Sequence, residues 1–417
     1  MSMGQTREWK GTGLTIPAHV PDEAVHDFDF YFTKERDSNA AFDVYDAYQE
    51  LQKNAPEIFY SPRYGGHWVV TRYEHLEAIY SDHEHFYSRN NMIPPAPEGG
   101  FAFLNYDGAK HAAFRSILQP FFSPKAVAQF EPVIRQVANS LIDEIIDKGH
   151  CEFVSEFAKK MPTLVVMKFI LQLPEEDTPY LIKFVDDVAH AGDDMKAFMD
   201  AFQQLAGYVA TRVIPARRAN PGSDVLSKII HSRPEGREIL EQEILGAVSV
   251  LIVGGLDTVV GALGIAAKHL AQNPDQLRRL VENPQLVPAA ADEMLRRFAI
   301  VNHARTVAKD IEFKGRHFAA GDMVLLPTTA TGIDDRRFEN ASEVDFGRTN
   351  NRKNLTFANG PHFCLGTFVA RSEMAIFLSE WTRRIPEFQI KQGATLKLLS
   401  GITNHLESLP LVWKAPG

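Results

Sequence analysis

The chain has 417 residues, is 45% hydrophobic and carries a formal net charge of −9. It can therefore bury a large core, and its acidic balance disfavours a general nucleic-acid binder. The only two cysteines, Cys151 and Cys364, exclude a disulfide framework and fit a reducing cytosol. The first twenty residues are charged and no apolar run reaches bilayer length, so we expect no signal peptide and no membrane anchor. We expect a cytoplasmic monomer with one domain over 1–417.

Helical periodicity dominates the first half of the chain. A short extended pair at 57–60 and 67–71 is expected near the start, with Tyr64-Gly65-Gly66 as its turn. The helices expected before residue 240 are 40–54, 73–81, 110–118, 123–148, 177–190, 194–217 and 222–231.

The second half begins with a long apolar helix over 240–273, followed by helices over 274–282 and 288–298. After Phe298 the pattern changes to short strands. These are expected at 304–307, 311–313 and 323–327, before a loop over 334–363, a final helix over 364–384 and a strand-and-turn tail over 388–413. The fold class is mainly α with a minor β part.

The most specific motif lies just before the final helix, where residues 357–366 read FANGPHFCLG. Backbone N–H groups and the dipole of the following helix favour a thiolate at Cys364. Gly360 and Gly366 allow the backbone to pass close to a flat, bulky group. An axial thiolate on iron donates electron density and favours cleavage of the O–O bond.

This segment resembles the haem-binding loop of the cytochrome P-450 superfamily. The resemblance covers nearly the whole chain and is closest to the bacterial camphor-hydroxylase subfamily. It implies a haem b cofactor, bound between the long central helix and the cysteine-loop helix, with Cys364 as the iron ligand.

Two further motifs of the superfamily follow in the matching order. Glu293 and Arg296 match its Glu-x-x-Arg helix motif, which implies a structural ion pair that locks the cysteine loop. Asp257 and Thr258, in the long helix, match its catalytic acid–alcohol pair. Thr258 would hold a water molecule and Asp257 would connect that water to solvent, because O₂ activation needs two protons.

Residues that contact the cofactor are also implied by the resemblance. His111 and Arg115 sit four apart on one helix face, and they match contacts to a haem propionate together with Arg305 and His362. Buried carboxylates need paired donors of this kind. The expected cofactor contacts are His111, Arg115, Arg305, Phe357, His362, Cys364 and Gly366.

The expected substrate pocket is apolar. The camphor enzyme binds a ketone with a tyrosine hydroxyl, whereas the matching position here is Gly99 or Phe101, depending on where a gap falls. Tyr106 lies near but requires a shifted loop, so camphor is not expected to be the natural substrate. The expected substrate contacts are Met92, Phe101, Phe103, Val250, Val253, Gly254, Val301, Ile402 and Thr403.

The expected function is insertion of one oxygen atom of O₂ into a C–H bond of a small apolar molecule such as a terpenoid or norisoprenoid. No flavin or Fe–S pattern occurs in the chain, so electrons are expected from a [2Fe–2S] ferredoxin and an NADH-dependent reductase. A peroxide-driven peroxygenase of the same fold and a haem-based ligand sensor are the alternatives. A basic docking patch is expected from Arg72, Lys110, Arg352 and Lys353.

Overall fold

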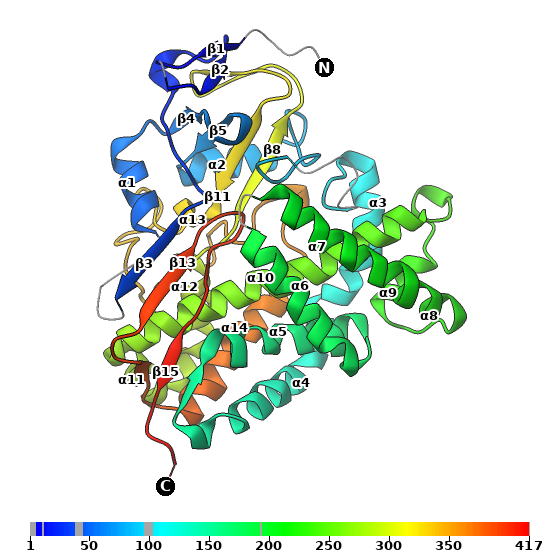
Figure 1. Ribbon diagram of the computed structural model, residues 1–417, viewed down its shortest axis with the longest axis vertical. Helices are drawn as coiled ribbons and strands as arrows, with labels where there is room; N and C mark the ends of the chain where they lie inside the picture. The colour runs from blue at the N-terminus through cyan, green and yellow to red at the C-terminus, as the bar shows by residue number, and fades with distance from the viewer. Residues whose placement is uncertain (1–5, 11, 38–44, 96–102, 192–193, 417) are drawn as a thin grey trace.

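The computed structural model describes residues 6–416 except 11, 38–44, 96–102 and 192–193. Helices form most of the molecule. The five-stranded sheet lies toward the end that holds the N-terminus (Figure 1). The expected class, mainly α with a minor β part, is confirmed. The helices are α1 (Asp46–Asn54), α2 (Tyr73–Ser81), α3 (Gly108–Leu118), α4 (Pro124–Asp143), α5 (Lys160–Val165), α6 (Thr178–Ala191), α7 (Met195–Tyr208), α8 (Ile214–Ala219), α9 (Val225–Ile230), α10 (Glu241–Gln272), α11 (Pro274–Glu282), α12 (Val287–Arg297), α13 (Thr328–Thr331) and α14 (Thr367–Arg384).

The strands form five small sheets within the described residues. The longest has the order β4-β5-β11-β8-β6, in which only the β5–β11 pair is parallel. Three-stranded sheets have the orders β12-β15-β7 and β14-β13-β3, and the pairs β1–β2 and β9–β10 complete the set. The strands are β1 (Thr6–Glu8), β2 (Thr15–Pro17), β3 (Thr33–Asp37), β4 (Ile58–Ser61), β5 (His67–Val70), β6 (Phe86–Tyr87), β7 (His150–Glu152), β8 (Asn302–Val307), β9 (Ile311–Phe313), β10 (Arg316–Phe318), β11 (Met323–Pro327), β12 (Gln389–Ile390), β13 (Thr395–Leu399), β14 (His405–Leu406) and β15 (Pro410–Val412).

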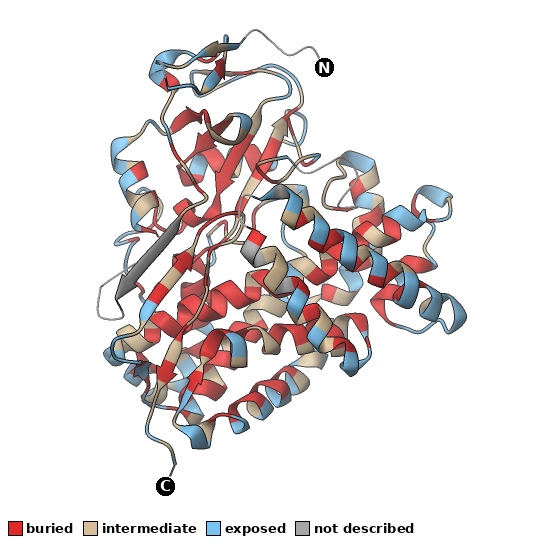
Figure 2. Cartoon of the chain, viewed as in Figure 1, coloured by how far each residue is buried: buried red, intermediate tan, exposed pale blue. Residues whose placement is uncertain are grey.

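Helix α10 crosses the centre of the molecule and packs against α5, α6, α7 and α14 (Figure 1). It is long and apolar enough to span a membrane, yet 61% of its most apolar window is buried inside the protein. A helix that is apolar around most of its circumference is buried in this way when it forms the core of a large domain. Much of the part of α10 that can be seen in Figure 2 is coloured as buried.

Two hydrophobic clusters meet on α10. The side chains up to Leu256 pack with α6, α7 and α9, whereas those from Val259 onward pack with α4, α12 and α14. Asp257 and Thr258 lie at the boundary and belong to neither cluster. The polar pair thus occupies the point where the two cores separate.

The loop before β14 lies directly on α10 at Gly261. A Cβ atom at this glycine would stand 2.6 Å from the carbonyl oxygen of Asn404, which is closer than real Cβ contacts allow. Only glycine permits this approach of the two backbones.

The long segment between α13 and α14 is fixed by a buried ion pair. Arg296 and Glu293, both fully buried on α12, form two hydrogen bonds of 2.8 Å to one another. Arg296 also donates to the carbonyl oxygens of Gly332, Ala341 and Glu343. The ion pair therefore holds the chain that leads to the cysteine loop.

Most expected elements coincide with observed ones, but some boundaries differ. The helix expected over 123–148 ends at Asp143, and the one expected over 194–217 is interrupted by a π-helical turn at Val209–Val213. The final helix begins at Thr367 rather than at Cys364. Helix α5 and strand β7 were not predicted.

Candidate active site

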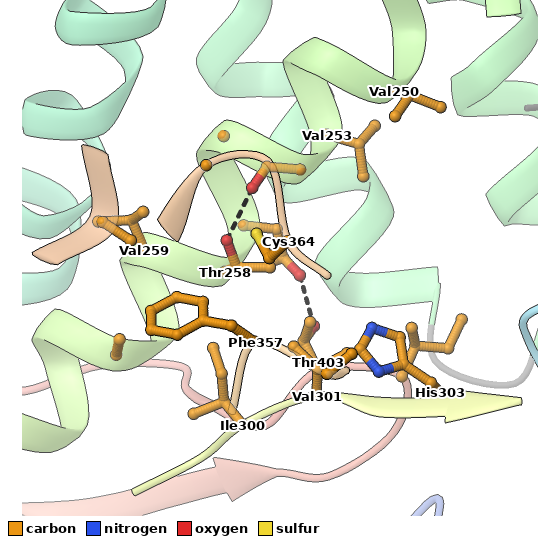
Figure 3. A pocket seen from close by; sticks show the side chains of 18 of the residues that line it. Val250, Val253, Thr258, Val259, Ile300, Val301, His303, Phe357, Cys364 and Thr403 are labelled. Atoms are coloured by element: carbon orange, nitrogen blue, oxygen red, sulfur yellow. Dashed lines mark hydrogen bonds between the residues drawn. The ribbon is translucent and has the colours of Figure 1, made fainter. Parts of the chain in front are cut away.

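A cavity of about 670 Å³ lies where the two hydrophobic clusters separate. Its walls come from α10, from α3, from the segment 356–366 and from the loop 399–403, as the close view in Figure 3 shows for part of its lining. Cys364 and Thr258 both line it. Segments far apart in the sequence thus contribute to a single site.

Cys364 is held by backbone contacts on both sides of the residue. Its amide donates to the carbonyl oxygen of Phe357 at 2.9 Å, and its carbonyl oxygen accepts the hydroxyl of Thr367 at 2.8 Å. Gly360 has φ +71, and a Cβ there would collide with the carbonyl oxygen of Tyr80. The glycine is therefore required for the loop to reach this position.

Opposing effects act on the thiol of Cys364. Burial raises its pKa, whereas a hydrogen bond from the backbone of Gly366, one from Thr367 and the charge of Arg115 lower it. The contribution expected from backbone N–H groups is thus among the lowering effects, and the thiolate itself stays a prediction. A coordinating metal ion would supply the missing stabilisation, since it deprotonates its thiol ligand.

Asp257 and Thr258 face the cavity from the middle of α10. The hydroxyl of Thr258 donates to the carbonyl oxygen of Gly254 at 2.8 Å, and the hydroxyl of Thr403 donates to the Asp257 carboxylate. A hydrogen bond from a threonine hydroxyl to the carbonyl oxygen four residues earlier competes with the backbone hydrogen bonds of a helix. Helix α10 is nevertheless continuous through Thr258. Gly254 has open space beside it, whereas a Cβ at Gly255 would stand 2.7 Å from the side chain of Val166.

Histidine and arginine side chains gather at one end of the cavity. The rings of His111 and His362 stack with centroids 3.9 Å apart, and Nε2 of His362 lies 3.3 Å from Oδ1 of Asp107. Burial, with help from His362 and Arg115, lowers the pKa of His111 to about 4. Arg115 donates to the carbonyl oxygen of Phe363 at 2.6 Å. Arg305 does not line the cavity; it is buried behind the wall, donates to the carbonyl oxygen of Ala304, and its charge acts on His303 and His362, which do line the cavity.

Comparisons with known proteins show the family to which the chain belongs. The family model "Cytochrome P450" matches residues 187–393. The probable cytochrome P450 127A1 of Sinorhizobium fredii (strain NBRC 101917 / NGR234) is 31% identical over 405 residues, which cover 95% of this chain and 97% of that protein. The chain belongs to the cytochrome P450 family.

Solved structures place this P450 close to the CYP101, or camphor-hydroxylase, subfamily. CYP101J2 superposes with a TM-score of 0.85 at 36% identity, covering 96% of this chain and 99% of that one. CYP101C1 also gives 0.85, at 32% identity, covering 96% of this chain and 100% of that one. The protein is therefore a haem-thiolate monooxygenase whose cofactor is haem b and which uses O₂ and a redox partner.

The residues of the cavity fit haem b. Among the residues that the structure describes, neither Arg115 nor Arg305 has an ion pair with a carboxylate. Arg305 is buried and Arg115 half-buried; a cation removed from water without a counter-charge favours a nearby anion, and haem b carries two propionates. Cys364 and the apolar Phe357 line the same cavity, so an iron ligand and a wall for a flat ring are both present.

Sequence reasoning missed His303, which also lines the cavity of this P450. Its Nδ1 lies 2.9 Å from the hydroxyl of Tyr80, and burial lowers its pKa to about 3. It precedes Arg305 by two residues on β8, so the two share one face of the strand. Because side chains alternate between the two faces of a strand, the position of Arg305 could have pointed to His303.

The expected substrate contacts fall mainly on the cavity wall. Phe101 and the rival position Gly99 lie outside the described residues, so the tyrosine replacement stays a prediction. Tyr106 does not line the cavity and its hydroxyl donates to Glu243 at 3.3 Å, which removes it as a polar anchor. The expected contacts that line the cavity are Met92, Phe103, Val250, Val253, Gly254, Val301, Ile402 and Thr403.

The wall also includes apolar side chains that were not predicted, from α6, α7 and the π-helical turn before them. These are Val166, Ile170, Val188, Ala191, Phe198 and Phe202. Because they lie on helices without a family motif, only the folded chain brings them to the pocket.

Proposed function

We propose that this P450 inserts one oxygen atom of O₂ into a C–H bond of a small apolar substrate of the terpenoid or norisoprenoid type, with electrons from a [2Fe–2S] ferredoxin fed by an NADH-dependent reductase. The observation that carries the proposal is that Cys364, the Asp257–Thr258 pair and a largely apolar wall line one cavity. A thiolate-ligated haem supplies activation of O₂ when it is bound.

The cofactor would be held by residues from four segments. Cys364 would ligate the iron, while His111, Arg115, Arg305 and His362 would bind the propionates. Phe357 and Gly366 would contact the ring, and we add His303 to the propionate group. In the tautomer in which Nδ1 accepts from the Tyr80 hydroxyl, the neutral imidazole would carry its hydrogen on Nε2 and would donate it to a carboxylate.

Proton delivery would depend on two side chains of α10. Thr258 would hold a water molecule beside the reaction site, and Asp257 would pass protons to that water, because an apolar pocket cannot supply protons unaided. The support for this assignment is that both residues line the cavity at the boundary between the two cores.

Recognition of the substrate would depend mainly on shape. Eight of the proposed contacts are cavity-lining residues, and only Thr403 among them carries a side-chain hydroxyl, which is already bonded to Asp257. In an apolar pocket each methylene contributes only about 1–3 kcal/mol of discrimination. A rigid hydrocarbon ring with a side chain fits such a wall better than a molecule that needs a polar anchor.

The proposed docking patch for the ferredoxin is smaller than expected. Arg72 is buried and donates to Asp334 and Asp335, so its assignment to the patch is wrong. Lys110 lies over the Tyr106 ring at 3.7 Å, and the exposed Arg352 pairs with Asp292. Lys353 is exposed, and so are the apolar Phe363 and Phe368 that flank Cys364 in sequence. A patch of Lys110, Arg352 and Lys353 beside these rings is what we now propose.

We further propose one domain over 1–417 that functions as a cytoplasmic monomer. Leu240, Phe363 and Phe368 are the large hydrophobic residues that the described surface exposes. A small apolar surface of this kind supports a monomer, since obligate interfaces are larger and more hydrophobic.

Reconstitution tests the whole proposal. The enzyme is mixed with a ferredoxin, its reductase, NADH and β-ionone, and product is compared with NADH consumed. Oxygenated product with a red-shifted reduced-CO band is expected. Product formed equally well from hydrogen peroxide alone would favour a peroxygenase, and binding without any turnover would favour a ligand sensor.

A further inference from the structure

Asp257 has an unusual environment for a buried carboxylate. It is 8% exposed, and within the described residues it forms no ion pair with a lysine or arginine. Its hydrogen-bond donor is the hydroxyl of Thr403, which binds Oδ2. Burying an ionised carboxylate requires such a donor, because the lost hydration is otherwise uncompensated.

Thr403 lies in a loop whose position is fixed from both sides. The amide of Asn302 donates to the carbonyl oxygen of Ile402, and the amide of Asn404 donates to that of Ile300, each at 2.8 Å. Thr403 itself forms a β-bridge with Val301. The hydroxyl is therefore presented to Asp257 by the backbone rather than by a flexible side chain alone.

Two buried amide side chains reinforce this placement. Asn302 donates to the carbonyl oxygen of Gly401 at 2.6 Å, and Asn404 donates to the hydroxyl of Thr329 at 2.9 Å. On the other side, the backbone of Asn404 rests on Gly261 of α10. The loop is thus attached both to the start of β8 and to the helix that carries Asp257.

Ile402 and Thr403 also line the cavity, and Figure 3 shows Thr403 there, so the same loop forms part of the proposed substrate pocket. We propose that Thr403 is a positioning residue: it holds the Asp257 carboxylate at the cavity wall and links the fit of the substrate at residues 402–403 to proton delivery. The inference rests on the proposed function, because it assumes that Asp257 supplies protons. It assigns to Thr403 a role beyond the substrate contact that we expected.

The geometry indicates how the link would operate. Thr403 occupies Oδ2, and Oδ1 has no hydrogen-bond partner in the described part of the chain. One oxygen is fixed, therefore, while the other is free to bind a water molecule. A ligand that displaces the loop would break the first contact and let the carboxylate turn away from the cavity.

The test compares isosteric and conservative variants of the reconstituted holoenzyme. Thr403→Val keeps the shape but loses the hydroxyl, Thr403→Ser keeps the hydroxyl, and Ile402→Val is the matched control on the neighbouring wall residue. Turnover and product per NADH are measured with β-ionone or camphor, whichever binds with the larger spin shift.

We expect Thr403→Val to lower kcat about tenfold, the loss typical of one hydrogen bond to a charged group, with KM changed less than about twofold. Thr403→Ser should restore kcat, and Ile402→Val should change KM rather than kcat. In an Asp257→Asn background, Thr403→Val should have no further effect on kcat, because both changes remove the same interaction.

Four results would overturn the inference. Thr403→Val with wild-type kcat, while Asp257→Asn is slow, would leave the proton relay intact but make Thr403 a wall residue only. A change in KM alone would show a substrate contact. Additive losses in the double variant would show that Thr403 acts independently of Asp257. If Asp257→Asn alone has wild-type kcat, the relay in the proposed function is wrong, and this inference fails with it.

Discussion

Arg296 binds Glu293 through Nε and Nη2 at 2.8 Å each, and both side chains are fully buried. Removing one partner leaves a buried charge uncompensated, which costs about 3–5 kcal/mol. Glu293→Gln should therefore lower the free energy of unfolding by about that amount and weaken retention of haem, because Arg296 also fixes the chain near Gly332 and Ala341.

An exposed pair with the same spacing is the control. Asp275 and Arg278 lie three residues apart on α11 and are largely solvent-exposed. Asp275→Asn should change the free energy of unfolding by less than about 0.5 kcal/mol. Urea unfolding followed by circular dichroism measures both. Equal losses in the two variants would contradict a special role for the buried pair.

The identity of the iron ligand is tested by Cys364→Ser. A serine oxygen is not a thiolate, so the reduced-CO band at the red-shifted position should be abolished. Cys151→Ser is the control, because Cys151 is buried in β7 away from the cavity. An unchanged spectrum in Cys364→Ser would falsify the ligand assignment.

The two relay residues should fail in different ways. Thr258→Ala should keep NADH consumption but divert it to hydrogen peroxide, since the water is no longer held. Asp257→Asn should instead slow turnover, since protons arrive more slowly, with a loss of about 10²-fold or more. Peroxide, product and NADH are measured together. Ser249→Ala, a buried change on the same helix outside the cavity lining, should match wild type; full coupling in both relay variants would make the pair structural.

Substrate preference is tested by titrating camphor and β-ionone into the ferric enzyme. Displacement of iron-bound water by an apolar ligand shifts the spin state, so the conversion reports occupancy. The ionone should give the larger shift, because Tyr106 is bonded to Glu243 and supplies no anchor for the camphor ketone. Near-complete conversion by camphor and none by the ionone would reveal another donor, for which His303 and Thr403 are the first candidates.

Glu373 predicts a pH dependence of stability. This acid on α14 is fully enclosed, one carboxylate oxygen lacks a hydrogen-bond partner, and burial raises its pKa to about 8 from an ordinary value of 4.5. Between these values the unfolded chain releases the proton that the folded protein keeps. The contribution of Glu373 to stability is therefore lost as pH rises through the window, by about 1.4 kcal/mol per pH unit.

Glu373→Gln should remove this slope and stabilise the protein at neutral pH. Glu380, two turns further along α14, is the contrasting control. Burial acts to raise its pKa, but hydrogen bonds from Arg383, Asn139 and Arg135 bring it below the usual range, so Glu380→Gln should destabilise the protein at neutral pH. The free energy of unfolding is measured with urea at pH 5 and pH 8. If it changes with pH as much in Glu373→Gln as in wild type, the prediction for Glu373 is wrong.

Local patterns predicted the elements that carry their own signals. Helix α2 occupies Tyr73–Ser81 as expected, and α10 differs from its prediction by one residue at each end, because apolar periodicity and length define them. The stretch 153–171 could not be predicted in the same way. It alternates π-helical turns with the short α5, and such turns depend on tertiary packing rather than on a sequence period.

The same distinction applies to the site. Cys364, Asp257 and Thr258 could be proposed from the sequence because their spacing matches a family motif, and all three line the cavity. Arg72 was misassigned because its partners, Asp334 and Asp335, are more than 260 residues away in sequence. The bond between Thr403 and Asp257, likewise, exists only after the C-terminal loop has folded onto α10.

The contact of Asn404 with Gly261 offers an engineering handle outside the pocket. Gly261 is not among the residues that line the cavity, yet a methyl group there would push the backbone that carries Thr403. Gly261→Ala should thus shift the loop at residues 402–403, and with it the cavity wall, although Gly261 itself does not line the cavity. Variants that accept bulkier compounds can therefore be sought at Gly261, behind the loop, because one added methyl group there would change the position of the cavity wall.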